Sequence, residues 1–259
     1  MTAFENSVVI VTGAGAGIGR ATASRFSRDG AHVAVVDLDT TAADATVELI
    51  RSAGGVANAI GCDVTRSESI REMIESVVAD HGGVHVMVNN VGGSLDGPLK
   101  DTTDQDFQAQ LQLNLASSFY GMRESLAVML PAGRGSIVNI ASAAGLMGSP
   151  GLGPYAAAKA AIINMTQTAA VENARSGVRI NCVVPGAIAT AGLLDWLEGK
   201  PGAREAWEQS LVPGRLGLPE EIASAVAFLA GGEASYINGA TLLVDGASAV
   251  KLPSLANPY

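Results

Sequence analysis

The stretch Ser7–Gly19, SVVIVTGAGAGIG, joins a short run of β-branched residues to a glycine-rich turn, and a helical pattern follows as far as Arg28. An apolar run of this length is typical of a strand that is buried on both faces of a sheet. Glycines let the backbone come close to a bound phosphate, and the start of the next helix presents free N–H groups there. The stretch therefore predicts a strand, a phosphate-binding turn and a helix. The alternative is a tight connection without a ligand.

An acidic residue ends the next expected strand, His32–Asp37, about 20 residues after the glycine turn. A carboxylate at this place can accept hydrogen bonds from both hydroxyl groups of an adenosine ribose, and it repels a 2′-phosphate. The glycine turn holds no Arg or Lys, and Leu38 follows the carboxylate. We therefore expect Asp37 to favour NAD over NADP. A solvated carboxylate at a strand end is the other interpretation of Asp37 alone.

The remainder of the chain alternates strand and helix patterns without a linker, a repeat or a low-complexity block. Further strands are expected at Val56–Cys62, Val84–Val88, Gly135–Ala141, Val178–Val184 and Ala240–Val244. Further helices are expected at Thr41–Ser52, Asp104–Leu130, from Tyr155 to about Arg175, and at Glu220–Ala230. Another helix is expected to begin at a capping box, Thr65–Glu68, and Pro131 is expected to end the helix Asp104–Leu130. This alternation predicts an α/β fold, a single Rossmann-type, doubly wound parallel sheet of about seven strands with helices on both faces. We expect residues 1–259 to form one domain.

The composition narrows the classes of function. The chain has 259 residues, 48% of them hydrophobic, and a net charge of −9. An acidic chain without a long basic run does not favour nucleic acid or an anionic membrane as a partner. No apolar run reaches the length of a membrane span, and no secretory signal is visible. Cys62 and Cys182 have no neighbouring cysteine or metal ligand, so we expect buried free thiols, no metal site and a cytoplasmic protein.

A second stretch, Gly153–Lys159 or GPYAAAK, places Tyr155 four residues before Lys159. Residues at this spacing lie on one face of a helix, so the ammonium group can assist a tyrosine that exchanges a proton. Such a pair is a weak indication on its own. It gains weight because ligands of doubly wound sheets bind beyond the carboxyl ends of the strands. The residues expected at those ends are Asp37, Asp63, Asn89, Ser142 and Pro185.

Together these motifs resemble the short-chain dehydrogenase/reductase family over nearly the whole chain. The matching pieces are TGAGAGIG at Thr12–Gly19, Asp63-Val64, NNVG at Asn89–Gly92, Asn114, Ser142, YAAAK at Tyr155–Lys159 and PGAIAT at Pro185–Thr190. Each motif is short, but their order is specific, and Ser142 stands thirteen residues before Tyr155, as in the family. One departure is Ala141, where many members have a second serine.

The resemblance implies hydride transfer between NAD and a secondary alcohol or ketone, with a catalytic tetrad of Asn114, Ser142, Tyr155 and Lys159. Tyr155 would be the general base in oxidation and the general acid in reduction. A phenol titrates near pH 10, so a base at neutral pH needs a pKa about three units lower, or roughly 4 kcal/mol of preference for the phenolate. Lys159 and the positive nicotinamide ring would supply it. Ser142 would hydrogen-bond the substrate oxygen, and Asn114 would anchor a water between Lys159 and solvent.

The resemblance also implies a set of cofactor contacts along the same edge of the sheet. Those with the pyrophosphate would come from Gly13, Gly17, Ile18 and Gly19. Those with the adenosine half would come from Asp37 for the ribose, from Asp63 and Val64 for the adenine, and from Asn89. Those with the nicotinamide half would come from Pro185, Gly186, Ile188 and Thr190, together with Tyr155 and Lys159.

The least family-like stretch, Ala187–Leu218, is expected to form a substrate lid. It contains both tryptophans, Trp196 and Trp207, among several leucines. One interpretation is an apolar pocket for an alicyclic or aryl secondary alcohol. The other is that these side chains pack the lid helices or a subunit interface. The family also implies a homotetramer that pairs the Asp104–Leu130 and Tyr155–Arg175 helices across a twofold axis.

Two other functions stay open. The same scaffold serves 3-oxoacyl thioester reductases, which act on acyl carrier protein or CoA substrates. Acyl carrier proteins are acidic, and Lys100, Arg123 and Arg134 could supply a basic rim, although the net charge of −9 does not favour one. The remaining alternative is a dinucleotide-binding regulator without catalytic activity. Such a regulator would have no need to retain both Tyr155 and Lys159.

Overall fold

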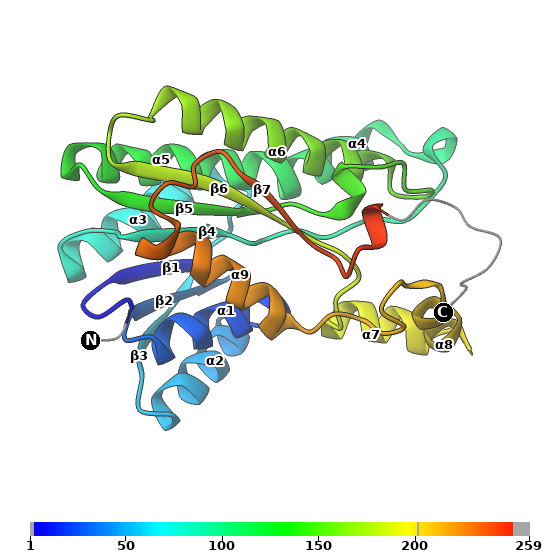
Figure 1. The fold of residues 1–259 in the computed structure, drawn as a ribbon, viewed down its shortest axis with the longest axis horizontal. Helices are drawn as coiled ribbons and strands as arrows, with labels where there is room; N and C mark the ends of the chain where they lie inside the picture. Colours follow the sequence, from blue (N-terminus) through cyan, green and yellow to red (C-terminus); the bar gives the residue numbers. More distant parts are fainter. Residues whose placement is uncertain (1–2, 201, 251–259) are drawn as a thin grey trace.

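Seven parallel strands form the centre of the structure, a computed structural model that describes residues 3–200 and 202–250. Residues 1–2, 201 and 251–259 lie outside the described part, so the ends of the expected domain and one residue of the expected lid are not covered. The strands are β1 Val8–Thr12, β2 His32–Asp37, β3 Val56–Gly61, β4 Val86–Asn89, β5 Gly135–Ile140, β6 Val178–Pro185 and β7 Thr241–Val244. Their order in the sheet is β3-β2-β1-β4-β5-β6-β7 (Figure 1), which confirms the predicted doubly wound parallel fold.

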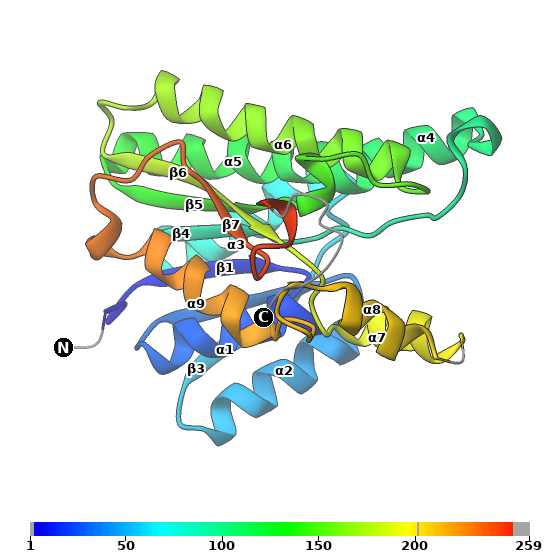
Figure 2. The ribbon, with the colours of Figure 1, turned by 45° about the vertical axis from the view of Figure 1, so that its right-hand side comes forward.

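Helices cover both faces of the sheet (Figures 1 and 2). Between two parallel strands the chain has to return to the opposite edge, and it does so through a helix packed on one face. One layer consists of α1 Gly17–Arg28, α2 Thr40–Ser52 and α9 Pro219–Ala230. The other consists of α3 Ser67–His81, α5 Ser117–Ala132 and α6 Gly153–Glu172. All five residues of β1 are buried, as a strand between two helix layers requires. An apolar core lies beneath each layer.

The expected helical stretch Asp104–Leu130 forms and reaches Ala132, but a π-helical segment interrupts its α-helical hydrogen-bond pattern. The segment divides into α4 Asp104–Leu111, a π-helical segment Gln112–Ala116, and α5. A π-helical turn changes the backbone hydrogen-bond pattern and frees a carbonyl group. The side-chain amide of Asn114, within this segment, donates to the Gln110 carbonyl at 3.0 Å. Pro131 does not stop α5, because the helix continues to its C-cap, Gly133, with φ of 65°.

The expected capping box at Thr65–Glu68 is also wrong. The Thr65 amide and hydroxyl both donate to the Asp63 carboxylate, at 3.0 and 2.6 Å. The N-cap of α3 is instead Arg66, which makes no side-chain cap. An aspartate two residues upstream can form a local turn that competes with a helix cap, and here that turn forms.

Both cysteines are buried and free, as expected. Burial raises the pKa of the Cys62 thiol to about 11 and that of the Cys182 thiol to about 12, so both are uncharged at neutral pH. Among the described residues, no helix has the length and apolar character needed to span a membrane.

Arg179 on β6 ties the sheet to the end of α9. Its guanidinium donates to the carbonyl oxygens of Leu229, Ala230 and Gly231 at 2.7 to 2.9 Å, and to that of Ile237 at 3.3 Å. The last carbonyls of a helix have no partner within it and carry a partial negative charge, so a cation satisfies both demands. Arg179 therefore fixes α9 against β6.

We expect Arg179→Met to lower the free energy of unfolding by about 2–3 kcal/mol, because several carbonyl groups lose a charged donor. Arg51→Met is the matched control. Arg51 is exposed and donates to the single carbonyl of Ala57, so its loss should cost about 1 kcal/mol or less. Urea unfolding followed by circular dichroism measures both variants. Equal destabilisation by the two would contradict the role given to Arg179.

Candidate active site

The predicted site residues come together at the carboxyl edge of the sheet, on the right-hand side of Figure 1. The glycine turn follows β1, Asp37 ends β2, Asn89 ends β4, Ser142 follows β5 and Pro185 ends β6. The helix α6 carries Tyr155 and Lys159, and the Lys159 ammonium reaches the end of β5. The topology therefore assembles side chains that lie far apart in the sequence.

The backbone explains the glycines of the turn. Gly13 and Gly17 have φ of 62° and 52°, in the left-handed region that residues with a side chain disfavour. A Cβ on Gly19 would lie 2.0 Å from the Gly13 carbonyl oxygen, so α1 starts in direct contact with the turn. The first N–H groups of α1 receive no side-chain cap from the N-cap residue, Ala16. The turn thus has the shape and the donors that a pyrophosphate requires.

Asn90 is absent from the predicted site residues, yet it holds the glycine turn. Its side-chain amide donates to the carbonyls of Thr12 and Gly13 at 2.9 and 3.2 Å. Side chains alternate along a strand, so the neighbouring Asn89 points the other way. There, Asn89 donates to the buried side chain of Asn139 at 2.8 Å. Any contact of Asn89 with a cofactor would have to come from its backbone. The NNVG motif contains both asparagines, and strand alternation is the signal that distinguishes them.

The Asp37 carboxylate is fixed by two backbone amides, those of Gly15 at 2.8 Å and Asp39 at 3.1 Å. A Cβ on Gly15 would lie 2.8 Å from Asp37 Oδ2 and 2.7 Å from the Ala42 Cβ, so the turn approaches the carboxylate closely. Each carboxylate oxygen can accept a further hydrogen bond. Both oxygens therefore keep capacity for ribose hydroxyl groups, and the residues present fit the adenosine half of NAD.

Asp63, Val64 and Ile18 have mainly local contacts. The Asp63 carboxylate accepts both bonds from Thr65. The Val64 side chain is buried in the core beneath α3, and Ile18 packs against the core of the opposite layer. If these residues contact a cofactor, backbone groups and apolar surface are what they have to offer.

Lys159 is a buried residue with a charged end group. Its side chain is 2% exposed, and its Nζ donates to the Ile140 carbonyl at 3.0 Å. No ion pair within residues 3–200 and 202–250 includes it. Burial lowers the pKa of Lys159 to about 8, so the ammonium form still predominates at neutral pH. The ammonium group fits at this place because residue 92 is glycine. A Cβ on Gly92 would lie 2.7 Å from the Lys159 Nζ.

Tyr155 lies next to this charge, with the Lys159 Nζ 5.6 Å from the centre of its ring. Burial raises the pKa of the Tyr155 phenol, and the nearby Ser142 hydroxyl acts in the opposite direction. Ser142 accepts a hydrogen bond from the Ala144 amide at 3.2 Å, which leaves its O–H group as a donor. In the chain alone, burial outweighs the effect of neighbouring groups. The lowered phenol pKa expected for a base is therefore not a property of the chain by itself.

The Asn114 side chain forms hydrogen bonds with backbone groups. Its Oδ1 accepts from the Gly93 amide at 3.0 Å, and its Nδ2 donates to the carbonyls of Gly93 and Gln110 at 2.9 and 3.0 Å. These bonds hold the loop that follows β4 and leave the side chain little capacity for the water expected at this place. Asn114 Oδ1 and Lys159 Nζ lie on the same side of Gly92, so the loop also sets the surroundings of the ammonium group.

The segment after β6 packs against the glycine turn. A Cβ on Gly17 would lie 3.2 Å from the methyl carbon of Thr190, and Ile188 is buried. A Cβ on Gly186 would lie 2.7 Å from the Asp245 Cβ, so Pro185 and Gly186 run close to the end of β7. Pro185–Thr190 thus reaches the glycine turn through Thr190, and its predicted contacts with the nicotinamide half stay a prediction.

Two short helices, α7 Ala191–Glu198 and α8 Ala203–Ser210, project beyond this edge in Figures 1 and 2. The rings of Trp196 and Trp207 meet edge to face, with centroids 5.7 Å apart. The Lys200 Nζ lies 3.3 Å from the Trp196 ring centre. These contacts pack α7 against α8. They agree with the interpretation that the tryptophans hold the lid helices together, rather than with the pocket-wall interpretation.

Comparisons with known proteins agree with this architecture. A sequence model described as enoyl-(acyl carrier protein) reductase matches residues 13–247. The 2-(S)-hydroxypropyl-CoM dehydrogenase 3 of Xanthobacter autotrophicus is 38% identical over 246 residues, which cover 94% of this chain and 96% of the relative. The cyclohexanol dehydrogenase of an Acinetobacter strain is 38% identical over 248 residues, 94% of this chain and 95% of the relative.

Comparison with solved structures also supports this architecture. A solved structure from Burkholderia xenovorans, described as a short-chain dehydrogenase/reductase, superposes with a TM-score of 0.94. It is 36% identical, and the match covers 98% of this chain and 100% of that one. With its parallel sheet, its glycine turn and these relatives, the chain belongs to the short-chain dehydrogenase/reductase family.

Proposed function

We propose that this chain transfers a hydride between NAD(H) and a secondary alcohol or ketone, with Tyr155 as the general acid and base. The observation that carries the proposal is the Lys159 ammonium, buried beside the Tyr155 ring without an ion-pair partner among the described residues. A buried charge is costly, and ligands of parallel sheets bind at the edge where this charge lies. An unusual titratable group in such a place indicates a functional site.

Each residue has one task in alcohol oxidation. The Tyr155 phenolate takes the hydroxyl proton, and Ser142 donates a hydrogen bond to the same oxygen. When bound, the oxidised dinucleotide accepts the hydride and adds a positive charge beside the phenol. Because burial raises the Tyr155 pKa in the chain alone, the Lys159 ammonium has to act together with that second charge. In ketone reduction, the same tyrosine returns the proton.

Asp37 supports NAD as the cofactor. Two amides hold its carboxylate in place, so a 2′-phosphate brought to the ribose position would meet a fixed negative charge. Arg20 is the first arginine after the glycine turn, but its Nε donates to the Thr46 hydroxyl at 3.1 Å and its guanidinium to the Gly15 carbonyl. Arg20 is therefore engaged in holding the turn and does not offer a phosphate site.

Apolar side chains near Ser142 and Tyr155 support an apolar or cyclic substrate. Leu146 and Met147 follow Ser142 in the chain, and both are partly exposed. Leu95, also exposed, belongs to the loop that meets theirs through the hydrogen bond from Gly97 to Gly151 at 2.9 Å. We infer that these loops and the lid at residues 187–218 enclose the substrate. The similarity to a cyclohexanol dehydrogenase supports an alicyclic alcohol.

A 3-oxoacyl thioester reductase is the second candidate. The description of the matching family model names an acyl carrier protein too, but with an enoyl substrate instead of a 3-oxoacyl one. The basic rim that an acidic carrier protein needs is not assembled here. Lys100 pairs with Asp101 at 2.7 Å, and Arg123 pairs with Glu124 at 2.7 Å. Arg134 precedes β5 and so lies at the amino edge of the sheet, opposite the site. We therefore favour the small alcohol or ketone.

Two free, buried thiols fit a reducing compartment, because extracellular proteins use such cysteines for disulfides more often. We propose on this ground that the protein acts in the cytoplasm.

We also propose a homotetramer that uses the outer face of α4, α5 and α6. A pocket of about 440 Å³ on this face is lined mainly by apolar side chains, and Phe119 is 42% exposed there. Light scattering should give a tetramer, and Phe119→Asp should shift the protein to smaller species because a charge would enter the interface. Leu49→Asp, at an exposed position of α2, is the control. A stable wild-type monomer would contradict this assembly.

Tyr155→Phe removes the proton-transfer group and leaves the ring. We expect it to lower kcat by about 10²- to 10⁴-fold, because that is the usual contribution of general acid–base catalysis. NADH binding, measured by calorimetry, should stay within about twofold of the wild type. Tyr120→Phe, on α5, removes a hydroxyl outside the site and should leave both quantities unchanged. An active Tyr155→Phe variant would refute the mechanism.

Asp37→Ser tests the cofactor preference. We expect wild-type kcat/KM to favour NAD, and the variant to lose that preference by about tenfold or more because the repulsion of the 2′-phosphate is removed. Asp44→Ser makes the same charge change on the exposed face of α2 and should keep the preference. If the wild type uses NADP as well as or better than NAD, the role of Asp37 is wrong.

A further inference from the structure

The lid enters and leaves the body of the protein at one paired point, which we call the lid base, residues 187–190 and 215–217. Ile188 and Gly217 form a parallel bridge. The Gly217 amide donates to the Ala187 carbonyl at 2.9 Å, and the Ala189 amide donates to the Gly217 carbonyl at 2.8 Å. A Cβ on Gly217 would lie 2.6 Å from Ile188 Cδ1, so the two segments are in close contact. The helices α7 and α8 lie between these segments in sequence.

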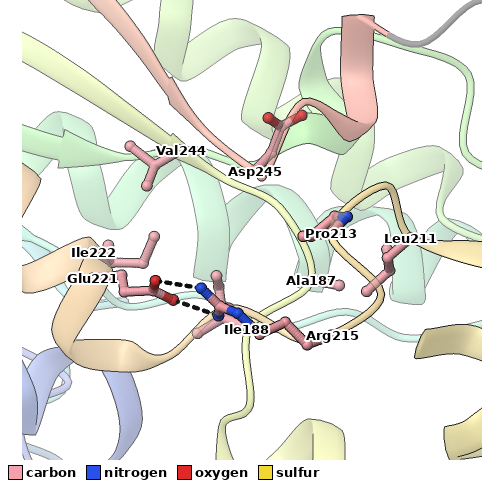
Figure 3. Close-up of a pocket in the computed structure, with 11 residues that line it drawn as sticks. Ala187, Ile188, Leu211, Pro213, Arg215, Glu221, Ile222, Val244 and Asp245 are labelled. Atoms are coloured by element: carbon pink, nitrogen blue, oxygen red, sulfur yellow. Dashed lines mark hydrogen bonds and ion pairs between the residues drawn. The ribbon is translucent and has the colours of Figure 1, made fainter. Parts of the chain in front are cut away.

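An ion pair attaches the lid base to α9 (Figure 3). The two guanidinium NH groups of Arg215 donate to the two carboxylate oxygens of Glu221, at 2.7 and 2.9 Å. A carboxylate held by two parallel bonds is fixed in orientation as well as in position. The hydrogen bond from Arg215, followed by that from the Leu218 amide, lowers the pKa of Glu221 to about 2. The pair is therefore fully charged at any pH at which the protein would be studied.

The lid base is packed through the buried side chains of Ile188 and Leu216, but it borders a hollow on its inner side. A pocket of about 110 Å³ lies between the lid base and the end of β7, with Ile188 and Leu211 on one side and Val244 and Asp245 on the other (Figure 3). Side chains that border a hollow lack contacts on that side, so their position is less firmly set than in a filled core. The two hydrogen bonds from Arg215 to Glu221 add a restraint toward α9 to the packing of Ile188 and Leu216.

The lid base leads directly to the candidate active site. The Thr190 amide donates to the Ile188 carbonyl at 2.7 Å, and the Thr190 methyl group lies against Gly17 of the pyrophosphate-binding turn. A displacement of Gly217 would therefore move Ile188 and Thr190 relative to that turn. The glycine turn itself is held separately, by Asn90 and Asp37.

We propose that Arg215 and Glu221 are positioning residues, which hold Ile188–Thr190 where the nicotinamide half of the cofactor binds. The inference rests on the proposed function, because it takes NAD(H) as the ligand. The two halves of the cofactor should then respond differently to loss of the ion pair. The nicotinamide half should lose its place, and the adenosine half should keep it.

If Glu221 only caps α9, the variants should behave differently. Glu221 is the third residue of α9 and accepts from the Leu218 amide at 2.7 Å, a capping bond that does not involve Arg215. Arg215→Met leaves this cap intact, and Glu221→Gln keeps an acceptor for the amide but removes the charge. If capping is all that matters, neither variant should discriminate between ligands.

Calorimetric titration with NADH and with ADP-ribose, which lacks the nicotinamide, separates the two roles. For Arg215→Met, and in the same direction for Glu221→Gln, we expect the Kd of NADH to rise about tenfold and that of ADP-ribose to change less than about twofold. Arg215→Lys keeps the charge without the planar fork and should give an intermediate value. Arg204→Met is the matched control on α8, because Arg204 pairs with Glu208 and is 51% exposed, against 55% for Arg215.

The outcomes are distinct. Equal weakening of both ligands, no change in either, or the same selective loss in Arg204→Met overturns the inference and leaves the proposed function standing. A wild-type protein that binds neither NADH nor ADP-ribose overturns the proposed function, and the inference falls with it. Thermal unfolding of each variant checks that it is folded, and if Arg215→Met is not, Arg215→Lys and Glu221→Gln decide the result.

Discussion

The hydrogen bond from the Lys159 ammonium to the Ile140 carbonyl is the constraint on which the site depends. A buried cation with one neutral partner is stable only if the surrounding structure fixes it firmly. Three features do so here. The absence of a side chain at Gly92 leaves the space, and Asn114 locks the loop that carries Gly92. Further along α6, the helix that carries Lys159, the Thr166 hydroxyl accepts a hydrogen bond from the side-chain amide of Asn139 on β5 at 2.9 Å. This bond fixes the position of α6 on the sheet.

Polar side chains around the site bind mostly to backbone. Asn90 holds the glycine turn, Asn114 holds the loop after β4, and Asp37 holds Gly15. Such bonds make the position of each loop independent of a bound molecule, which lowers the ordering cost of binding. The glycine turn is therefore formed without a ligand, which fits the cofactor site proposed for it. The segment proposed as the lid differs in this respect, because the backbone bonds and the Arg215–Glu221 pair of the lid base join its two ends to each other and to α9.

The fold was predictable because its signals are local. The apolar run before the glycine turn, the exact strand His32–Asp37 and the alternation of strand and helix each depend on neighbouring residues. Helix spacing predicted that Tyr155 and Lys159 lie together, and the resemblance to the family, with strand ends sharing one edge, added Ser142. What could not be predicted depends on a choice between partners. Thr65 bonds to Asp63 instead of capping α3, and the Asn114 side chain bonds to the Gln110 carbonyl where the helix becomes π-helical. Arg215 and Glu221 are six residues apart, and they pair only because the chain turns between them, which could not be predicted from the sequence.

The edge-to-face contact between Trp196 and Trp207 has a practical consequence. The chain contains two tryptophans, and both stand in the lid. Tryptophan emission from the whole protein is therefore light from the lid alone, free of any signal from the sheet or its helices. The cation over the Trp196 ring makes this emission sensitive to how α7 and α8 sit together. The protein thus contains its own optical reporter of the segment proposed as the substrate lid.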